Sequence, residues 1–175
     1  IAVANHLIEQ KYTYKGGICF LGGSAGGLTG TAVANMAPEL FFSMVLLVPF
    51  CDPLTTMLNE KLPLTPSEWE LWGNPIKSKK YFKSILSYAP YNNLRKTSYP
   101  PMFVTTSLFD SRVLYSEPVK YVAKLRELKD DKNLQLLKCK MKAASHGGPS
   151  GRDNSIKELA EEFSYILKTA KIKSY

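Results

Sequence analysis

A short glycine-rich segment between an apolar run and a small-residue run is the strongest constraint on how this chain folds. Residues 22–26, with the sequence G-G-S-A-G, follow the strand-like run Ile18–Leu21 and open the helix-like run Ala25–Ala37, which stops at Pro38. A strand that enters a helix through so tight a turn needs glycine wherever a side chain would collide. The segment therefore predicts a strand–turn–helix unit with Ser24 at the turn.

The rest of the chain repeats this alternation of strand-like and helix-like segments. Four apolar runs have the length of strands: Ile18–Leu21, Met44–Val48, Met102–Thr105 and Leu134–Cys139. The helix-like segments are Ala2–Gln10, Ala25–Ala37, Glu117–Leu128 and a last helix that is expected to start at a Ser155/Glu158 capping box. The pattern predicts an α/β fold of three αβα layers with a mainly parallel sheet. Residues 51–101, rich in Pro, Tyr, Lys and Asn, are expected to form an insertion at the carboxyl edge of that sheet.

The composition excludes several classes of protein. The chain has 175 residues, of which 45% are hydrophobic and 22% are charged, as in an ordinary globular domain. No apolar run approaches the roughly 20 residues of a membrane-spanning helix. The net charge is +8, but Lys far outnumbers Arg and is scattered, so we expect no nucleic-acid partner. The three widely spaced cysteines indicate a reducing cytoplasm, and the two histidines suggest neither a metal site nor a cofactor.

Ser24 has candidate partners for a catalytic triad further along the chain. Where a serine stands on a turn of this kind, the chain order is serine, acid, histidine. Asp110 follows the run Met102–Thr105, and His146 follows the run Leu134–Cys139 and is the only histidine after Ser24. If the chain has a triad, its base is therefore His146, and Asp110 is the acid that would orient it.

For acyl transfer, the Ala25 N–H at the start of the helix would stabilise a developing oxyanion. Interpretations without catalysis are also open for each of these residues. The segment 22–26 could instead be a tight turn or a phosphate loop, although it lacks the P-loop pattern G-x-x-x-x-G-K-[ST]. Asp110 could be a surface turn residue, and His146 a loop or capping residue.

A set of longer strings makes the chain similar to a known family. They are G-G-S-A-G-G at 22–27, V-P-F-C-D at 48–52, T-T-M-L at 55–58, E-W-E at 68–70, W-G-N-P at 72–75, S-Y-A-P-Y-N-N at 87–93, D-S-R-V at 110–113, Y-V-A-K-L-R-E-L at 121–128 and H-G-G-P-S-G-R at 146–152. In these strings, which span essentially the whole chain, the sequence resembles the catalytic domain of the prolyl oligopeptidase family of serine peptidases, in particular its oligopeptidase B (protease II) branch.

The resemblance implies a fold and an activity. The fold would be the C-terminal portion of an α/β-hydrolase fold, with Ser24 as nucleophile, Asp110 as acid and His146 as base. The family cleaves short peptides, and this branch cuts after Arg or Lys, so short basic peptides are the implied substrates. A carboxylate in a partly desolvated S1 pocket suits a guanidinium.

By the same resemblance, the acidic S1 pocket is formed by Glu68, Glu70 or both. Glu68 also fits a capping box that starts at Thr65, and side chains two residues apart on a helix point in different directions. One glutamate could therefore serve the pocket while the other caps the helix or is solvated. Arg112, two residues after the acid, is a weaker candidate for binding a substrate carbonyl.

The resemblance also predicts what residues 1–175 lack. Family members are several times longer. They contain an N-terminal β-propeller, the first half of the hydrolase domain and a tyrosine that donates to the oxyanion. We expect this truncated peptidase domain to contain none of these three features. The strand Ile18–Leu21 would then be an open edge, which predicts a homodimer or larger assembly built across it. Two other functions remain open: a catalytically inactive remnant that self-associates, and a small esterase of the same fold.

Overall fold

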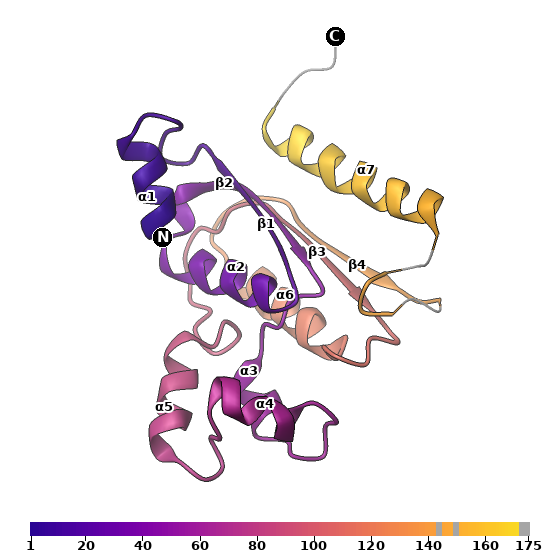
Figure 1. Ribbon diagram of the computed structural model, residues 1–175. Helices are drawn as coiled ribbons and strands as arrows, with labels where there is room; N and C mark the ends of the chain where they lie inside the picture. Colours follow the sequence, from indigo (N-terminus) through magenta and orange to yellow (C-terminus); the bar gives the residue numbers. More distant parts are fainter. Residues whose placement is uncertain (143–144, 149–150, 172–175) are drawn as a thin grey trace.

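A four-stranded parallel sheet organises the chain (Figure 1). The computed structural model describes residues 1–142, 145–148 and 151–171. Within them the strands are β1 (Ile18–Gly23), β2 (Phe41–Leu47), β3 (Met102–Ser107) and β4 (Gln135–Lys140). They lie side by side in chain order, and each neighbouring pair is parallel. The predicted α/β class and all four predicted strands are confirmed, although β2 begins three residues earlier than expected because Phe41 already pairs with Ile18.

Helices cover both faces of this sheet. The helices α1 (Ala2–Glu9), α2 (Ala25–Met36) and α6 (Ser116–Leu128) lie on one face, and α7 (Arg152–Thr169) lies on the other (Figure 1). The alternation of side chains along a strand explains the two layers. Met44 and Leu46 of β2 are buried in the cluster that includes α2 and α6, whereas Val45 between them packs with Tyr165 of α7.

The predicted insertion at 51–101 folds into a helical lobe. It contains α3 (Pro53–Met57), α4 (Thr65–Trp72) and α5 (Lys79–Tyr88), which follow the carboxyl end of β2 and lie together below the sheet in Figure 1. The lobe has its own apolar cluster, in which Met57 and Ile85 are fully buried and Leu28 of α2 takes part. This shared cluster fixes the lobe to α2, the helix that follows Ser24.

The last helix begins earlier than the expected capping box. α7 starts at Arg152, after Gly151 at a φ of 103°. The Ser155 hydroxyl donates to the Gly151 carbonyl oxygen at 3.2 Å, so Ser155 lies inside the first turn and does not cap it. Glu158 pairs instead with Lys140 of β4 at 2.5 Å. The capping-box prediction was therefore wrong, because α7 begins three residues before Ser155 and Gly151 takes the N-cap position.

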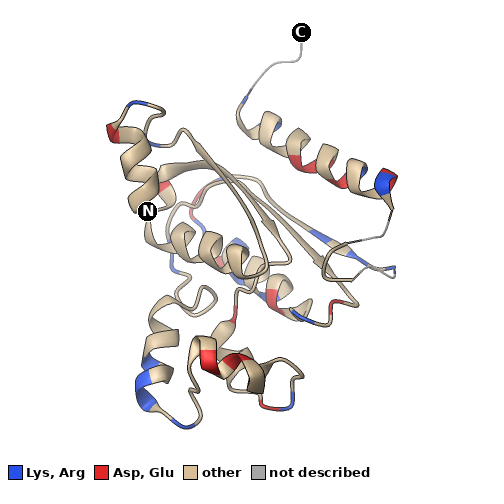
Figure 2. Ribbon diagram, in the orientation of Figure 1, with Lys and Arg blue, Asp and Glu red and all other residues tan. Residues whose placement is uncertain are grey.

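Three features of the fold bear on the expected partners: the edges of the sheet, the charges on the helical lobe and the length of the apolar helices. β1 and β4 are the edge strands of the described sheet, so β1 has an unpaired side as predicted. Figure 2 shows that basic residues gather on α5 and the turn before it, while acidic residues lie on α4. Across the part of the chain that the structure describes, no helix is long and apolar enough to cross a membrane.

Candidate active site

Ser24 lies at the strained turn that the sequence predicts. It joins β1 to α2 with φ 54° and ψ −120°, a conformation that residues with a side chain rarely adopt. Such strain costs of order 1–3 kcal/mol and persists only where the surroundings hold it. Here the Ser24 N–H donates to the Leu47 carbonyl oxygen at 2.8 Å, and the Ser24 carbonyl oxygen accepts from the Leu28 and Phe50 N–H groups at 3.0 Å each.

The two glycines that flank Ser24 have different roles. A Cβ at Gly22 would lie 2.7 Å from the Phe20 ring and 2.9 Å from the Gly26 carbonyl oxygen, so the turn cannot close with a side chain there. A Cβ at Gly26 would meet nothing within 4 Å. The need for glycine is thus confirmed at position 22, whereas nothing in the described chain requires it at position 26.

Ala25 is the first residue of α2 and lines the same cavity as Ser24. The Ser24 side chain makes no capping hydrogen bond at this helix end. The first N–H groups of a helix have no partner within the helix, and they carry the positive end of its dipole. The Ala25 N–H is therefore well placed to face an oxyanion on a substrate bound to Ser24.

Asp110 and His146 are brought together across 36 residues of sequence. His146 Nδ1 lies 2.8 Å from Asp110 Oδ2. The other carboxylate oxygen accepts from the Arg112 N–H at 2.9 Å and the Val113 N–H at 3.0 Å, and the Asp110 side chain is completely buried. A neutral His146 therefore donates its Nδ1 proton to Asp110, which leaves Nε2 free to accept one.

Ser24 is not joined to this pair. Among the hydrogen bonds of the described residues, none connects Ser24 with His146, and the two side chains line different cavities. Pro149 and Ser150, of the string that contains His146, lie outside the described residues. Catalytic hydrogen bonds are often long or absent without substrate and shorten only when it binds.

A cavity of about 320 Å³ opens beside Ser24. Phe50 and Trp72 form part of its apolar wall, and their rings lie 5.7 Å apart. Three charged side chains also line it: Glu68, Arg112 and Glu117. A cavity with an apolar wall and a few charged groups next to a candidate nucleophile is the usual form of a substrate pocket.

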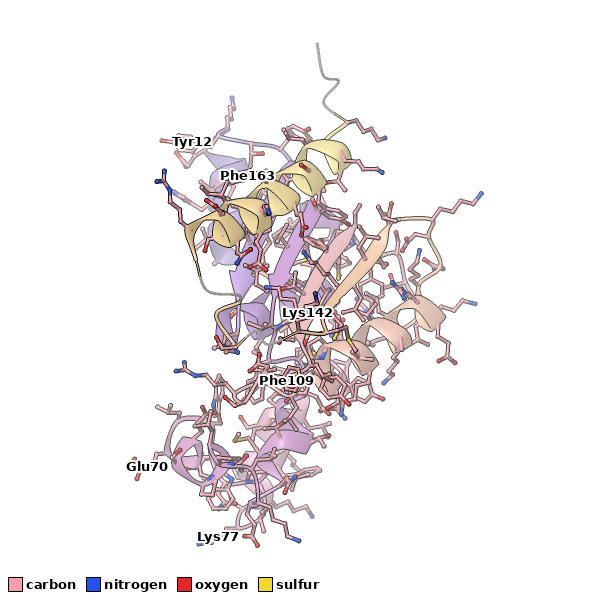
Figure 3. The ribbon with its side chains drawn as sticks, turned by 90° about the vertical axis from the view of Figure 1, so that its right-hand side faces the viewer. Tyr12, Glu70, Lys77, Phe109, Lys142 and Phe163 are labelled. Atoms are coloured by element: carbon pink, nitrogen blue, oxygen red, sulfur yellow. The ribbon has the colours of Figure 1, made fainter. Side chains whose placement is uncertain are left out.

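The structure separates the two glutamates of the E-W-E string. Glu68 is half-buried, lines the cavity and accepts a hydrogen bond from the Trp72 indole N–H at 3.1 Å. Its carboxylate does not cap α4, and the Thr65 hydroxyl donates to the Thr56 carbonyl oxygen at 3.0 Å, so the expected capping box does not form. Glu70 is exposed and points outward from the lobe (Figure 3). Only Glu68 is thus placed beside Ser24.

Sequence reasoning missed Glu117. It lies in the first turn of α6, where an acidic residue normally faces solvent and complements the helix dipole, so its type and position gave no signal. In the fold it is 3% exposed and lines the cavity. Burial raises the pKa of the Glu117 carboxyl to about 7, and hydrogen bonds from Thr56 and the Asp52 N–H limit the rise.

These residues define the chemistry that the site can perform. A strained serine between a strand and a helix, with a histidine–aspartate pair after later strands of a parallel sheet, is the arrangement of α/β-hydrolases. Within the described residues, no group of three His, Cys, Asp or Glu side chains could hold a metal ion. The site has the groups needed for acyl transfer by a serine nucleophile.

Comparison with known proteins identifies the family. The sequence model of the Prolyl oligopeptidase family matches residues 1–173. The chain therefore belongs to the prolyl oligopeptidase family of serine peptidases, as its sequence strings predicted. Over 167 residues it is 50% identical to Protease 2 of Moraxella lacunata and 47% identical to dipeptidyl aminopeptidase BI of Pseudoxanthomonas mexicana. Each of these matches covers 95% of this chain, but 24% and 23% of the respective relative.

A solved structure agrees with this assignment. Oligopeptidase B from Trypanosoma brucei, in a closed form with covalently bound antipain, superposes with a TM-score of 0.94 at 41% sequence identity. That match covers 99% of this chain and 24% of the solved one. The fold therefore corresponds to a portion of the α/β-hydrolase domain of oligopeptidase B. The chain spans about a quarter of the length of the relatives that it matches.

Proposed function

We propose that this chain carries the catalytic triad and the specificity pocket of a serine peptidase that cleaves short peptides after Arg or Lys. The observation that carries the proposal is that Ser24, on its strained turn, and Glu68 line the same cavity. In this proposal Ser24 would meet the scissile carbonyl and Glu68 a basic side chain of the same peptide. The similarity to Protease 2 and to oligopeptidase B supports the same reaction.

In the proposed mechanism, Ser24 Oγ attacks the carbonyl carbon while His146 Nε2 takes the serine proton. Asp110 holds the opposite edge of the imidazole through the 2.8 Å contact with Nδ1 and stabilises the imidazolium that forms. The Ala25 N–H donates to the oxyanion. His146 then gives its proton to the leaving amine, and water hydrolyses the acyl-enzyme in a second, equivalent half-reaction. His146 must approach Ser24 when the substrate binds.

Glu68 is the proposed counter-charge for the substrate's basic side chain. It is half-buried beside the Phe50 and Trp72 rings, and the Trp72 indole holds one of its carboxylate oxygens. A guanidinium can lie along this apolar wall and bond to the carboxylate. Arg112 also lines the cavity and is exposed, and we assign it to a carbonyl oxygen of the bound peptide.

Two further proposals concern assembly and location. β1 is an edge strand and Leu21 on it is 51% exposed, which supports pairing with a second copy of the chain across this edge. Sedimentation at micromolar concentration should then show a dimer or larger species, and a single monomeric species would exclude this assembly.

Cys19, Cys51 and Cys139 are all free thiols, which supports a reducing compartment such as the cytoplasm.

Matched substrates test the peptidase proposal. Citrulline has nearly the shape of arginine without its charge, so arginyl and citrullinyl amides isolate the role of the pocket carboxylate. Glu68→Gln should raise KM for the arginyl amide by about 10-fold or more and change the citrullinyl value little. Glu70→Gln is the matched control, and its exposed side chain predicts the smaller effect. Equal changes for both substrates in Glu68→Gln would refute the pocket assignment and favour an esterase-like site.

A further inference from the structure

A buried carboxylate without an ion-pair partner lies in the wall of the cavity beside Ser24. Glu117 is 3% exposed and lines the same cavity as Glu68. Lys120 on the same helix is paired with Asp52, and its charge is the smallest of the effects that act on the pKa of Glu117. Among the described residues, no Lys, Arg or His forms an ion pair with Glu117. Burying a carboxylate without a counter-ion is costly, and such groups are concentrated at functional sites.

Hydrogen bonds fix both oxygens of this carboxylate. The Thr56 hydroxyl donates to Glu117 Oε1 at 2.5 Å, and the Asp52 N–H donates to Oε2 at 2.9 Å. Thr56 lies in α3 and Asp52 is the residue just before it, and both donors stabilise the charged form. The carboxylate is therefore held in one orientation at the junction of α3 and α6, so it can carry a charge there without rearrangement.

We propose that Glu117 is a second specificity-determining carboxylate of this pocket, and that it supplies, together with Glu68, the negative charge that selects a basic side chain. The inference rests on the proposed function, which identifies the cavity as the pocket for Arg or Lys. Glu68 approaches from α4 and Glu117 from α6, so the two carboxylates lie on different walls. A cation between two walls meets negative charge on both sides, whereas a neutral side chain brings no positive charge to Glu117.

The proposal couples substrate charge to a proton. In the empty pocket, the pKa of Glu117 is about 7, so the carboxyl is partly protonated near neutral pH. A cation in the pocket favours the carboxylate and lowers this pKa, and binding at about pH 7 must then release a proton. The other ionisable groups around Glu117 are Cys51 and Asp52 before α3, Lys120 on α6, and Arg112 and Glu68 on the cavity walls.

Binding calorimetry with two probes tests the proposal independently of turnover. Nα-acetyl-arginine amide and its citrulline analogue are titrated into the full chain in buffers of different ionisation enthalpy. The arginine probe should release a fraction of a proton at about pH 7. Its affinity relative to the citrulline probe should rise about 5-fold between pH 6 and pH 8, if the cation lowers the pKa of Glu117 by about one unit. Glu117→Gln should abolish both effects, because its amide preserves the hydrogen-bonding shape but cannot ionise.

Two controls separate Glu117 from its neighbours. Glu68→Gln should weaken the arginine probe but keep the proton release, and Glu70→Gln should change neither. Three results would each overturn the inference. They are unchanged proton release in Glu117→Gln, a ratio of arginine to citrulline affinity in the wild type that does not change with pH, and no binding of the arginine probe to the folded chain. If Glu117→Gln fails to fold, the wild-type pH dependence still decides. Failure of the peptidase proposal is seen separately, as binding of the probe without any reaction at Ser24.

Discussion

His146 Nδ1 lies 2.8 Å from Asp110 Oδ2, while the other oxygen of Asp110 accepts two backbone N–H groups. The carboxylate is therefore fixed before the imidazole meets it. The loop after β3 builds this support, because it returns the Arg112 and Val113 N–H groups to the side chain that precedes them. The His146 imidazole is thus oriented by a buried carboxylate, even though it has no hydrogen bond to Ser24 in the described structure.

Asp110→Asn should keep the loop folded but lose the orientation of the base. The amide oxygen of Asn can still accept from the backbone, but its NH₂ group would face His146 Nδ1 and select the wrong tautomer. We expect the rate of acylation at Ser24 to fall by about 10⁴-fold with little change in substrate KM. Single-turnover acylation with an activated ester measures this step. A fall of less than about 10-fold would show that Asp110 does not orient the base.

Strain at Ser24 predicts that activity and stability oppose each other at this residue. Ser24→Gly removes the side chain that disfavours φ 54°, whereas Ser24→Ala keeps the Cβ and therefore the strain. The glycine variant should be more stable than the alanine variant by about 1 kcal/mol, after the greater chain entropy of glycine is included. Urea unfolding of the two inactive variants makes the comparison. An alanine variant of equal or greater stability would mean that the turn is not strained.

Two adjacent glycines of α2 should respond very differently to a methyl group. A Cβ at Gly27 would lie 2.6 Å from both Cα and Cβ of Pro49, which sits in the backbone after β2 and cannot move aside. Gly27→Ala should therefore cost about 2–3 kcal/mol of unfolding free energy. Gly26→Ala, with nothing within 4 Å, should be neutral or slightly stabilising. Thermal unfolding of both variants provides the measurement, and similar losses would contradict the packing described here.

The raised pKa of Glu117 predicts a loss of stability with rising pH. Burial raises this pKa from 4.5 to about 7, so the stabilising contribution of the protonated carboxyl is complete below about pH 4.5 and disappears as the pH rises through 7. Over that interval the wild type should lose about 3 kcal/mol of unfolding free energy relative to Glu117→Gln, which cannot ionise. Urea unfolding at about pH 5 and about pH 8 measures the difference. Parallel pH profiles of the two proteins would show that Glu117 is not buried as a titrating acid.

The sequence predicted the sheet and the turn at Ser24 well, because both depend on local signals. The apolar runs fixed the strands, and the G-G-S-A-G segment predicted the strained turn, which the φ of Ser24 confirms. The order of serine, acid and histidine selected Asp110 and His146, which the fold then brings together. The roles of these residues in catalysis stay predictions.

Features that depend on the surroundings of a residue were not predictable. Glu68 and Glu158 both matched a capping pattern, but a tryptophan indole and a lysine on another element offered them stronger partners. Glu117 looked like an ordinary first-turn acid until α3 covered it. For Glu117 and Glu158 the deciding group lies on a separate element, and no local sequence pattern contains that information. Trp72 lies on α4 together with Glu68, one turn further along the helix.

The central claim, that Ser24 is a nucleophile activated by His146, is tested most directly by covalent labelling. The chain is treated with a fluorophosphonate, and the adduct is read from the intact mass, with Ser24→Ala and His146→Ala as controls. We expect one adduct per chain in the wild type, none in Ser24→Ala and a greatly slowed reaction in His146→Ala. No adduct on the folded wild-type chain, or one that persists in Ser24→Ala, would contradict it.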